Sequence, residues 1–188
     1  EVHQPPEERR QGDGAEIENA TGNTIGPGNV ISGNAEVGVF LESSAVGNTV
    51  RGNYVGTDAP GTTVIGNGRN GVQVGCLPLA GTCGVGAATS NVIGGTTSDA
   101  RNVIVGSGED GVFLMNGADD NVVQGNAIGT DATGTLTLGN AGHGVRVLDS
   151  NRVRIGGSSA AAQGNVIVHN TGAGVVVEGT STNVSVLG

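Results

Sequence analysis

The sequence has no lysine, and its eight basic residues, all arginine, are outnumbered by 17 acidic ones, so the formal net charge is -9. We therefore expect no nucleic-acid partner, because no basic stripe offsets the repulsion from phosphates. No apolar run is long enough to cross a bilayer, so we expect no membrane span. Aromatic residues are also scarce, with only Phe40, Tyr54 and Phe113. This scarcity weakens a carbohydrate site without excluding it, since sugar-binding clefts usually stack aromatic rings on pyranose faces.

The only two cysteines, Cys76 and Cys83, lie in an insertion at residues 75–83. If the chain is extracellular, we expect a disulfide that closes this loop, and free thiols are the alternative. No histidine is near them in sequence, so the pair does not predict a zinc site.

What the sequence does contain is repetition. The phrase Asn-x-(Val/Ile) occurs twice in each cycle, and a third phrase, Gly-Val-x-(Val/Leu), closes the cycle at residues 38–41, 71–74, 111–114, 144–147 and 174–177. The first copies of the Asn phrase begin at Asn23, Asn48, Asn91, Asn121 and Asn151, and the second copies at Asn29, Asn53, Asn102, Asn126 and Asn165. Self-similarity of this kind indicates a repeat architecture.

Each cycle contains three short apolar stretches separated by Gly, Asn, Asp, Ser and Thr, residues that favour turns. The third position of each Asn phrase is Val or Ile while the second varies, which is the period of two that strands have. Without hairpin signals, such strands predict an all-β fold, a parallel β-helix of five to six rungs with three strands per rung. The crossover preference of parallel strands favours a right-handed coil. We expect the ten Asn residues to stack into structural ladders at the corners.

The two ends depart from this pattern. Residues 1–22 are charged and not periodic, so we expect an arm or linker, one use of which is a strand added to a neighbouring subunit. The coil is expected over residues 23–188, with an inserted loop near 75–89. At its end the register slips, because Ser185 takes the usual place of Val or Ile. An uncovered coil end favours head-to-tail self-association, and the equal alternative is that the sequence is a fragment or a domain of a larger protein.

Aligning the Gly-Val phrases places Asp110 and His143 in one column on adjacent rungs, with Arg146 and Glu109 close by. A polysaccharide lyase or epimerase needs such a set, with a base to remove a proton and a cation to stabilise the resulting charge. The competing interpretation is a group of solvent-facing polar residues at a corner.

Acidic residues give a second candidate site. Asp119 and Asp120 are expected near Asp149 on the next rung, which makes a weak calcium site the one cofactor that the sequence leaves open. Asp58 and Asp131 occupy equivalent turns two rungs apart, too far to share one ion, so we expect each to cap its own Thr-Asp-Ala turn.

The phrases Asn-Val-Ile-Gly-Gly at residues 91–95, Gly-Asn-x-Ile-Gly-Thr-Asp-Ala-Thr-Gly at 125–134, and Gly-Val-x-Val resemble those of bacterial right-handed parallel β-helix repeat proteins in the pectin-lyase-like fold group. The resemblance covers about residues 23–188 and implies a secreted or cell-surface protein. In that group some members act on polysaccharides and many have no known activity. We expect an extracellular structural or adhesive protein, such as a filament subunit; the alternative is a lyase, epimerase or polysaccharide-binding module.

Overall fold

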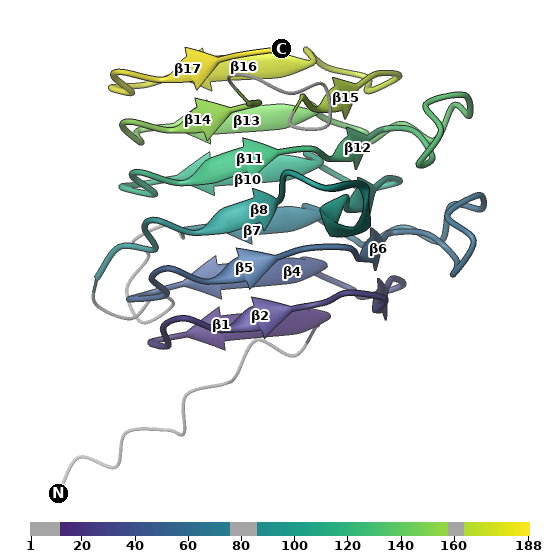
Figure 1. Cartoon of the computed structure of the whole chain (residues 1–188), viewed down its shortest axis with the longest axis horizontal. Helices are drawn as coiled ribbons and strands as arrows, with labels where there is room; N and C mark the ends of the chain where they lie inside the picture. The colour runs from purple at the N-terminus through teal and green to yellow at the C-terminus, as the bar shows by residue number, and fades with distance from the viewer. Residues whose placement is uncertain (1–11, 76–85, 158–163) are drawn as a thin grey trace, which may run out of the picture.

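The computed structural model describes residues 12–75, 86–157 and 164–188, which form a right-handed parallel β-helix (Figure 1). Three parallel sheets make its faces, two of six strands and one of five. The first sheet consists of β1 (Ala15–Glu18), β4 (Val39–Glu42), β7 (Val72–Val74), β10 (Val112–Met115), β13 (Val145–Leu148) and β16 (Val175–Glu178). The expected all-β coil with three strands per rung is therefore confirmed.

The other two sheets are built from two- and three-residue strands. The second sheet consists of β2 (Thr24–Ile25), β5 (Thr49–Val50), β8 (Val92–Gly94), β11 (Val122–Gln124), β14 (Arg154–Ile155) and β17 (Ser185–Val186). The third sheet consists of β3 (Val30–Ile31), β6 (Tyr54–Val55), β9 (Val103–Ile104), β12 (Ala127–Ile128) and β15 (Val166–Ile167). One 3₁₀ turn, η1 (Ser98–Ala100), interrupts the path between β8 and β9.

The core is a stack of inward Val, Ile and Leu side chains that runs along the coil axis. In the second sheet, for example, Val50, Ile93, Val123 and Ile155 are paired in register from rung to rung and are almost completely buried. No single rung buries its apolar face alone, so the stack of rungs supplies the hydrophobic stabilisation.

The coil begins before residue 23, where the Asn pattern placed its start. Ala15 to Glu18 form β1, which pairs with β4 of the same chain, and Ile17 points into the core and is 8% exposed. This strand lacks the Asn and Gly-Val phrases but keeps the alternation of inward Ala15 and Ile17, which is sufficient to extend the sheet. This part of the expected arm therefore pairs within its own chain.

The alignment of Asn151 with Asn121 was wrong by two residues. Val122 pairs with Arg154, so Val153 lies opposite Asn121 and Ile155 takes the inward place expected for Val153. The sequence allowed both alignments because Val153 and Ile155 are two residues apart and both face inward. The same shift removes the expected slip at the last rung, since Val186 pairs with Ile155 and Ser185 points outward opposite Arg154.

Candidate functional site

The column that contains Asp110 and His143 is formed as a series of hydrogen bonds between rungs. The N–H of Asp110 donates to Asn70 Oδ1 at 3.0 Å, and the N–H of His143 donates to Asp110 Oδ1 at 2.6 Å. The N–H of Ala173 in turn donates to His143 Nδ1 at 2.9 Å. Each side chain thus accepts a hydrogen bond from the backbone of a neighbouring rung. The column alignment predicted that Asp110 and His143 are neighbours, but it did not predict these bonds to the backbone.

This bonding limits what His143 can do as a base. A neutral imidazole whose Nδ1 accepts a hydrogen bond carries its proton on Nε2. His143 therefore presents a donor, not a lone pair, on its remaining nitrogen. Asp110, only 5% exposed, is likewise occupied through Oδ1 by the backbone of the next rung.

Arg146 lies on β13 beside this column. Its guanidinium bonds Glu178 on β16, with Nε 2.6 Å from Oε1, and lies 4.7 Å from the centre of the Phe113 ring. Asp110 Oδ2 is 3.8 Å from Nη1 of the same guanidinium. Glu109 instead pairs with Arg69 at 3.2 Å. The four residues expected at this site are neighbours. The charges of Arg146 and Glu109, however, are already paired with those of Glu178 and Arg69.

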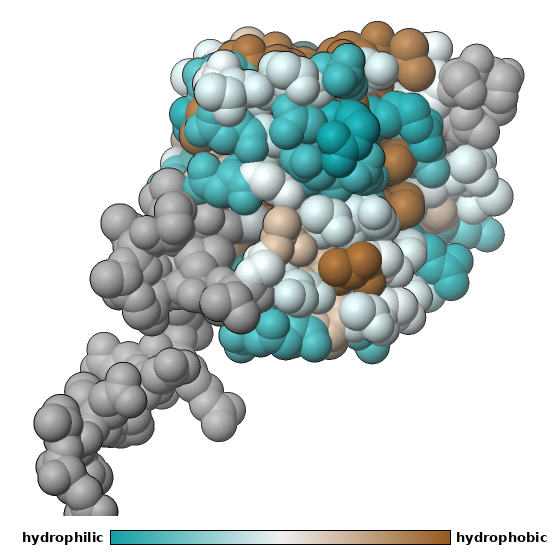
Figure 2. Space-filling model, turned by 90° about the vertical axis from the view of Figure 1, so that its left-hand side faces the viewer, coloured by the Kyte–Doolittle hydropathy of each residue, from teal (hydrophilic) through white to brown (hydrophobic). Residues whose placement is uncertain are grey.

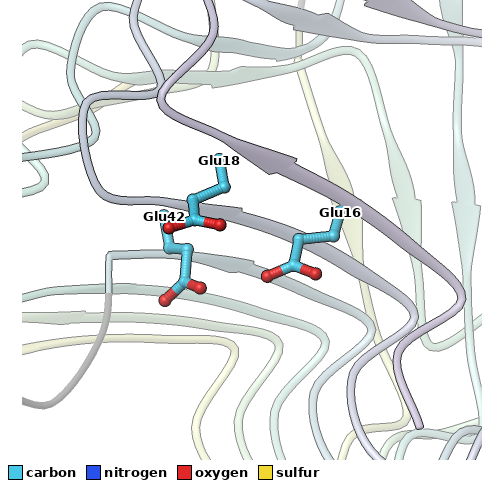
Figure 3. Close-up of side chains that lie close together, drawn as sticks. All are labelled: Glu16, Glu18 and Glu42. Atoms are coloured by element: carbon cyan, nitrogen blue, oxygen red, sulfur yellow. The ribbon is translucent and has the colours of Figure 1, made fainter. Parts of the chain in front are cut away.

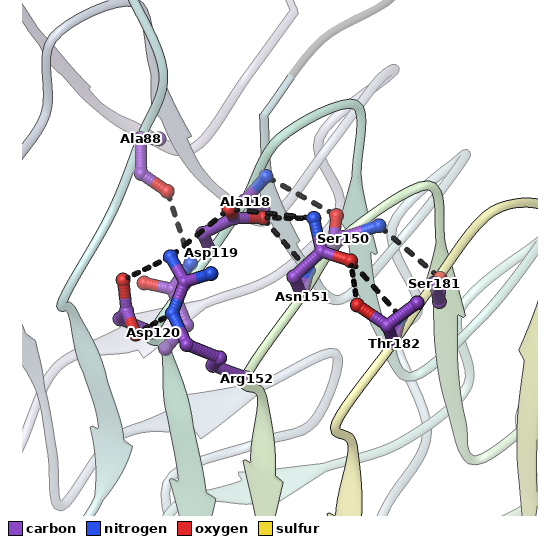
Figure 4. Close-up of polar contacts among 10 residues, drawn as sticks. Ala88, Ala118, Asp119, Asp120, Ser150, Asn151, Arg152, Ser181 and Thr182 are labelled. Atoms are coloured by element: carbon purple, nitrogen blue, oxygen red, sulfur yellow. Dashed lines mark hydrogen bonds and ion pairs between the residues drawn. The ribbon is translucent and has the colours of Figure 1, made fainter.

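The acidic turn expected to bind calcium is occupied by an arginine (Figure 4). Arg152 donates from Nε to Asp120 at 2.7 Å and from Nη2 to Asp119 at 3.2 Å. Its hydrogen bond and charge lower the pKa of Asp120. The shifted register places Asn151 beside Asp119, where its N–H donates at 2.7 Å.

Asp149 does not join Asp119 and Asp120, because its Oδ1 accepts the N–H and the hydroxyl of Thr180 on the following rung. These bonds lower its pKa. Asp58 and Asp131 are likewise engaged in their own turns. Asp58 Oδ1 accepts the N–H groups of Thr62 and Thr63, which lower its pKa to about 2.

Asp131 has the equivalent arrangement, with bonds from the backbone N–H groups of Thr135 and Leu136 to Oδ1. The Thr133 side chain bonds the same carboxylate and is the main cause of its lowered pKa, followed by the N–H of Leu136. These two carboxylates therefore act as turn caps.

A carboxylate group that the sequence analysis missed lies on the outer face of the first sheet. Oxygen atoms of Glu16, Glu18 and Glu42 all lie within 4.8 Å of one another, on β1 and β4 (Figure 3). Glu18 is the register partner of Glu42, which is 5% exposed. The available signal was the Glu-x-Glu spacing of β1, which places Glu16 and Glu18 on one face of a strand. The sequence analysis assigned these residues to the arm and therefore did not consider a strand here.

The Asn ladders run along two corners. In the first, Asn23, Asn48, Asn91 and Asn121 each bond the next through Nδ2 and Oδ1 at 3.0–3.1 Å, and Val153 then takes the place of an Asn. In the second, the five amides bond in sequence from Asn29 through Asn53, Asn102 and Asn126 to Asn165. Asn151 belongs to neither series.

A third ladder was missed. Asn34 bonds Asn67, and Asn140 bonds Asn170, each at 2.8 Å, with Ser107 in the position between the two pairs. The signal was present in the sequence, since each of these five residues stands four positions before the glycine that opens the next Gly-Val phrase.

Cys76 and Cys83, and most of the inserted loop, lie outside the described residues. In the part of the chain that the structure describes, no helix has the length and apolar character needed to cross a bilayer. Comparison with protein-family models, curated proteins and solved structures gave no match.

Proposed function

We propose that the protein is an extracellular structural or adhesive β-helix that acts by self-association through an end of its coil. A filament of stacked subunits and a closed assembly are the two forms this association can take. The extracellular location is what the resemblance of the phrases at residues 91–95 and 125–134 to bacterial β-helix repeat proteins implies.

The observation that carries the proposal is the exposed apolar surface of the last rung. Val177, Val186 and Leu187 are 42%, 57% and 40% exposed, and Figure 2 shows hydrophobic surface along this end of the coil. Among the described strands, β15, β16 and β17 each lie at the margin of their sheet. A strand at the margin of a sheet can pair with one further strand.

The candidate catalytic groups support the same choice. Asp110 and His143 bond the backbone of adjacent rungs, and Arg146 is paired with Glu178. A catalytic base or cation needs its reactive atom available to substrate. These side chains instead connect one rung to the next, which is the use expected in a structural coil.

The test is to measure the assembly state of the purified chain over a range of concentrations by sedimentation velocity and negative-stain microscopy. The proposal predicts assemblies whose population rises with concentration. A chain that stays monomeric at every concentration would overturn it.

The second candidate function is action on, or binding to, an acidic polysaccharide. It is favoured by one observation, the partial exposure of the Glu109 and Arg146 side chains, 46% and 33%, close to Asp110 and His143. Here the test is cleavage of uronate polymers by the wild-type chain, His143→Ala and Arg146→Ala. Cleavage lost in both variants would favour this candidate over the structural one.

A further inference from the structure

His143 belongs to a column of side chains that accept hydrogen bonds from the backbone of an adjacent rung. The other acceptors of this column in the described structure are Asp13, Asn70 and Asp110, each through Oδ1. His143 accepts through Nδ1, from the N–H of Ala173 at 2.9 Å. One imidazole therefore does the work that an amide or a carboxylate does elsewhere in the column.

The imidazole differs from the other acceptors in its response to a proton. An amide does not titrate, and a carboxyl group keeps an acceptor oxygen even when it is protonated. An imidazole nitrogen has a single lone pair, so a proton on it changes the acceptor into a donor. Histidine is also the side chain that ordinarily changes charge between about pH 5 and 8. Of the bonds in this column, the bond to His143 is the one that a proton abolishes.

The backbone beyond the ring leaves no place for a proton on Nδ1. A Cβ on Gly172 would lie 2.6 Å from His143 Nδ1 and 3.0 Å from the carbonyl oxygen of Gly142, so the two turns are in close contact. A proton on Nδ1 would point at the N–H of Ala173, which would set two donors against each other. The bond is lost whether the ring turns away or the segment at residues 171–174 moves.

Charged groups face the imidazole from the preceding rung and from its own strand. In the turn before β10, Asp110 accepts the N–H of His143, and the carboxylate of Glu109 is paired with an arginine. On β13, Arg146 is paired with Glu178 of β16, and one of its nitrogens lies 3.8 Å from Asp110. Each of these groups thus already has a partner.

The segment that His143 contacts on the following rung offers nothing to a charged ring. Residues 171–174 are Thr, Gly, Ala and Gly and contain no titratable side chain. His169 precedes this segment, and its carbonyl lies against Gly139 rather than against the ring. A protonated ring therefore has carboxylates on the rung before it and none on the segment that the neutral ring binds.

We propose that His143 is a pH switch in the contact between β13 and the segment at residues 171–174. The neutral imidazole binds the segment through the N–H of Ala173, and protonation of Nδ1 releases it. Because only the neutral form accepts this bond, the contact weakens as the pH falls. The corner ladders consist of amides, so the change stays local to this contact. The switch does not depend on self-association.

The experiment is NMR of the full chain between about pH 8 and about pH 4.5, which covers the ordinary range of histidine. The ring nitrogen shifts of His143 should show a neutral ring protonated on Nε2. As the ring gains its second proton, the exchange protection of the Ala173 amide should fall about five- to tenfold, as expected for one lost hydrogen bond. The amide of Val166 on the same rung donates to the Asn126 carbonyl and should keep its protection.

Three variants identify the titrating group. His143→Asn keeps an acceptor that does not titrate, so its Ala173 amide should keep the same protection at every pH. Asp110→Asn and His169→Asn should keep the wild-type change, because neither removes the imidazole at position 143.

Several results would overturn the switch. They are a neutral ring protonated on Nδ1, a ring that gains no proton above about pH 4.5, constant protection at Ala173 while the ring titrates, and an equal fall in His143→Asn.

Discussion

At the scale of single residues, the asparagine amide suits the coil corner because it donates and accepts at the same time. Asn67 uses both functions, accepting from Asn34 through Oδ1 and donating from Nδ2 to the Ile31 carbonyl. Ser107 occupies the equivalent position one rung on, but its side chain is shorter, and its buried hydroxyl has no hydrogen-bond partner in the described structure. The third ladder is therefore incomplete at one position.

We predict that Ser107→Asn raises the free energy of unfolding by about 1 kcal/mol, because an amide there completes the ladder between Asn67 and Asn140. Space is available because a glycine faces each of these two side chains. A Cβ on Gly71 would lie 2.9 Å from Ser107 Oγ, and a Cβ on Gly111 would lie 2.9 Å from Asn140 Nδ2. The glycine that makes room for Asn140 thus has an equivalent beside Ser107. Denaturant unfolding measures the change. Asn140→Ser is the matched control and should lower stability; a destabilised Ser107→Asn would contradict the argument.

His143 allows the structural and catalytic roles to be separated by two substitutions. We predict that His143→Ala loses up to about 1 kcal/mol of stability, because the N–H of Ala173 loses its acceptor. His143→Asn should recover most of this loss, since an amide oxygen also accepts. Thermal unfolding of both variants is the measurement. Equal loss in both would mean that the imidazole itself is required.

The turn around Asp58 should depend on pH in a narrow acidic window. The N–H groups of Thr62 and Thr63 lower the pKa of Asp58 from 3.8 to about 2 in the folded chain. The resulting stabilisation of the turn is therefore complete above pH 3.8 and is lost as the pH falls through about 2. We predict that amide exchange at Thr62 and Thr63 accelerates over this window.

Asp58→Asn is the control for that measurement, because it keeps an acceptor oxygen and does not titrate. Its exchange rates should show only the intrinsic pH dependence of free amides. Identical profiles for this variant and the wild type would mean that the carboxylate does not hold the turn.

At the scale of elements, the turn between β10 and β11 and the turn that precedes β14 are joined by charge. Arg152 lies against Asp119 and Asp120, where the sequence predicted a weak calcium site. We predict that calcium leaves the melting temperature of the wild type unchanged and raises that of Arg152→Ala by about 2–4 °C. Arg154→Ala, which leaves the two carboxylates paired, is the control. An equal shift in wild type and Arg152→Ala would show that Arg152 does not block the ion.

The sequence predicted the elements better than their register. The inward position of Val123 and the ladder through Asn126 follow from period-two alternation, which a strand imposes on any sequence. The register at Asn151 did not follow, because Val153 and Ile155 satisfy the same alternation and only the length of the preceding turn separates them. The bonds of Asp110, His143 and Arg152 also depend on contacts between rungs about 30 residues apart, which a single sequence does not specify.

At the scale of the whole molecule, both copies of an associating pair carry a formal charge of -9 and repel each other over distances longer than the contact itself. Salt shortens the screening length from about 10 Å at 0.1 M to about 3 Å at 1 M. We therefore predict that association of the wild-type chain tightens about two- to tenfold over this range, as measured by sedimentation equilibrium.

The direction of this salt effect distinguishes two kinds of contact. An apolar contact between coil ends loses nothing when charges are screened. A contact held by ion pairs between copies would weaken instead. Glu36→Gln, which removes a charge from the side of the coil, should tighten association slightly at low salt and have no effect at high salt. Weaker association at high salt would therefore contradict the apolar contact, whichever ends of the coil meet.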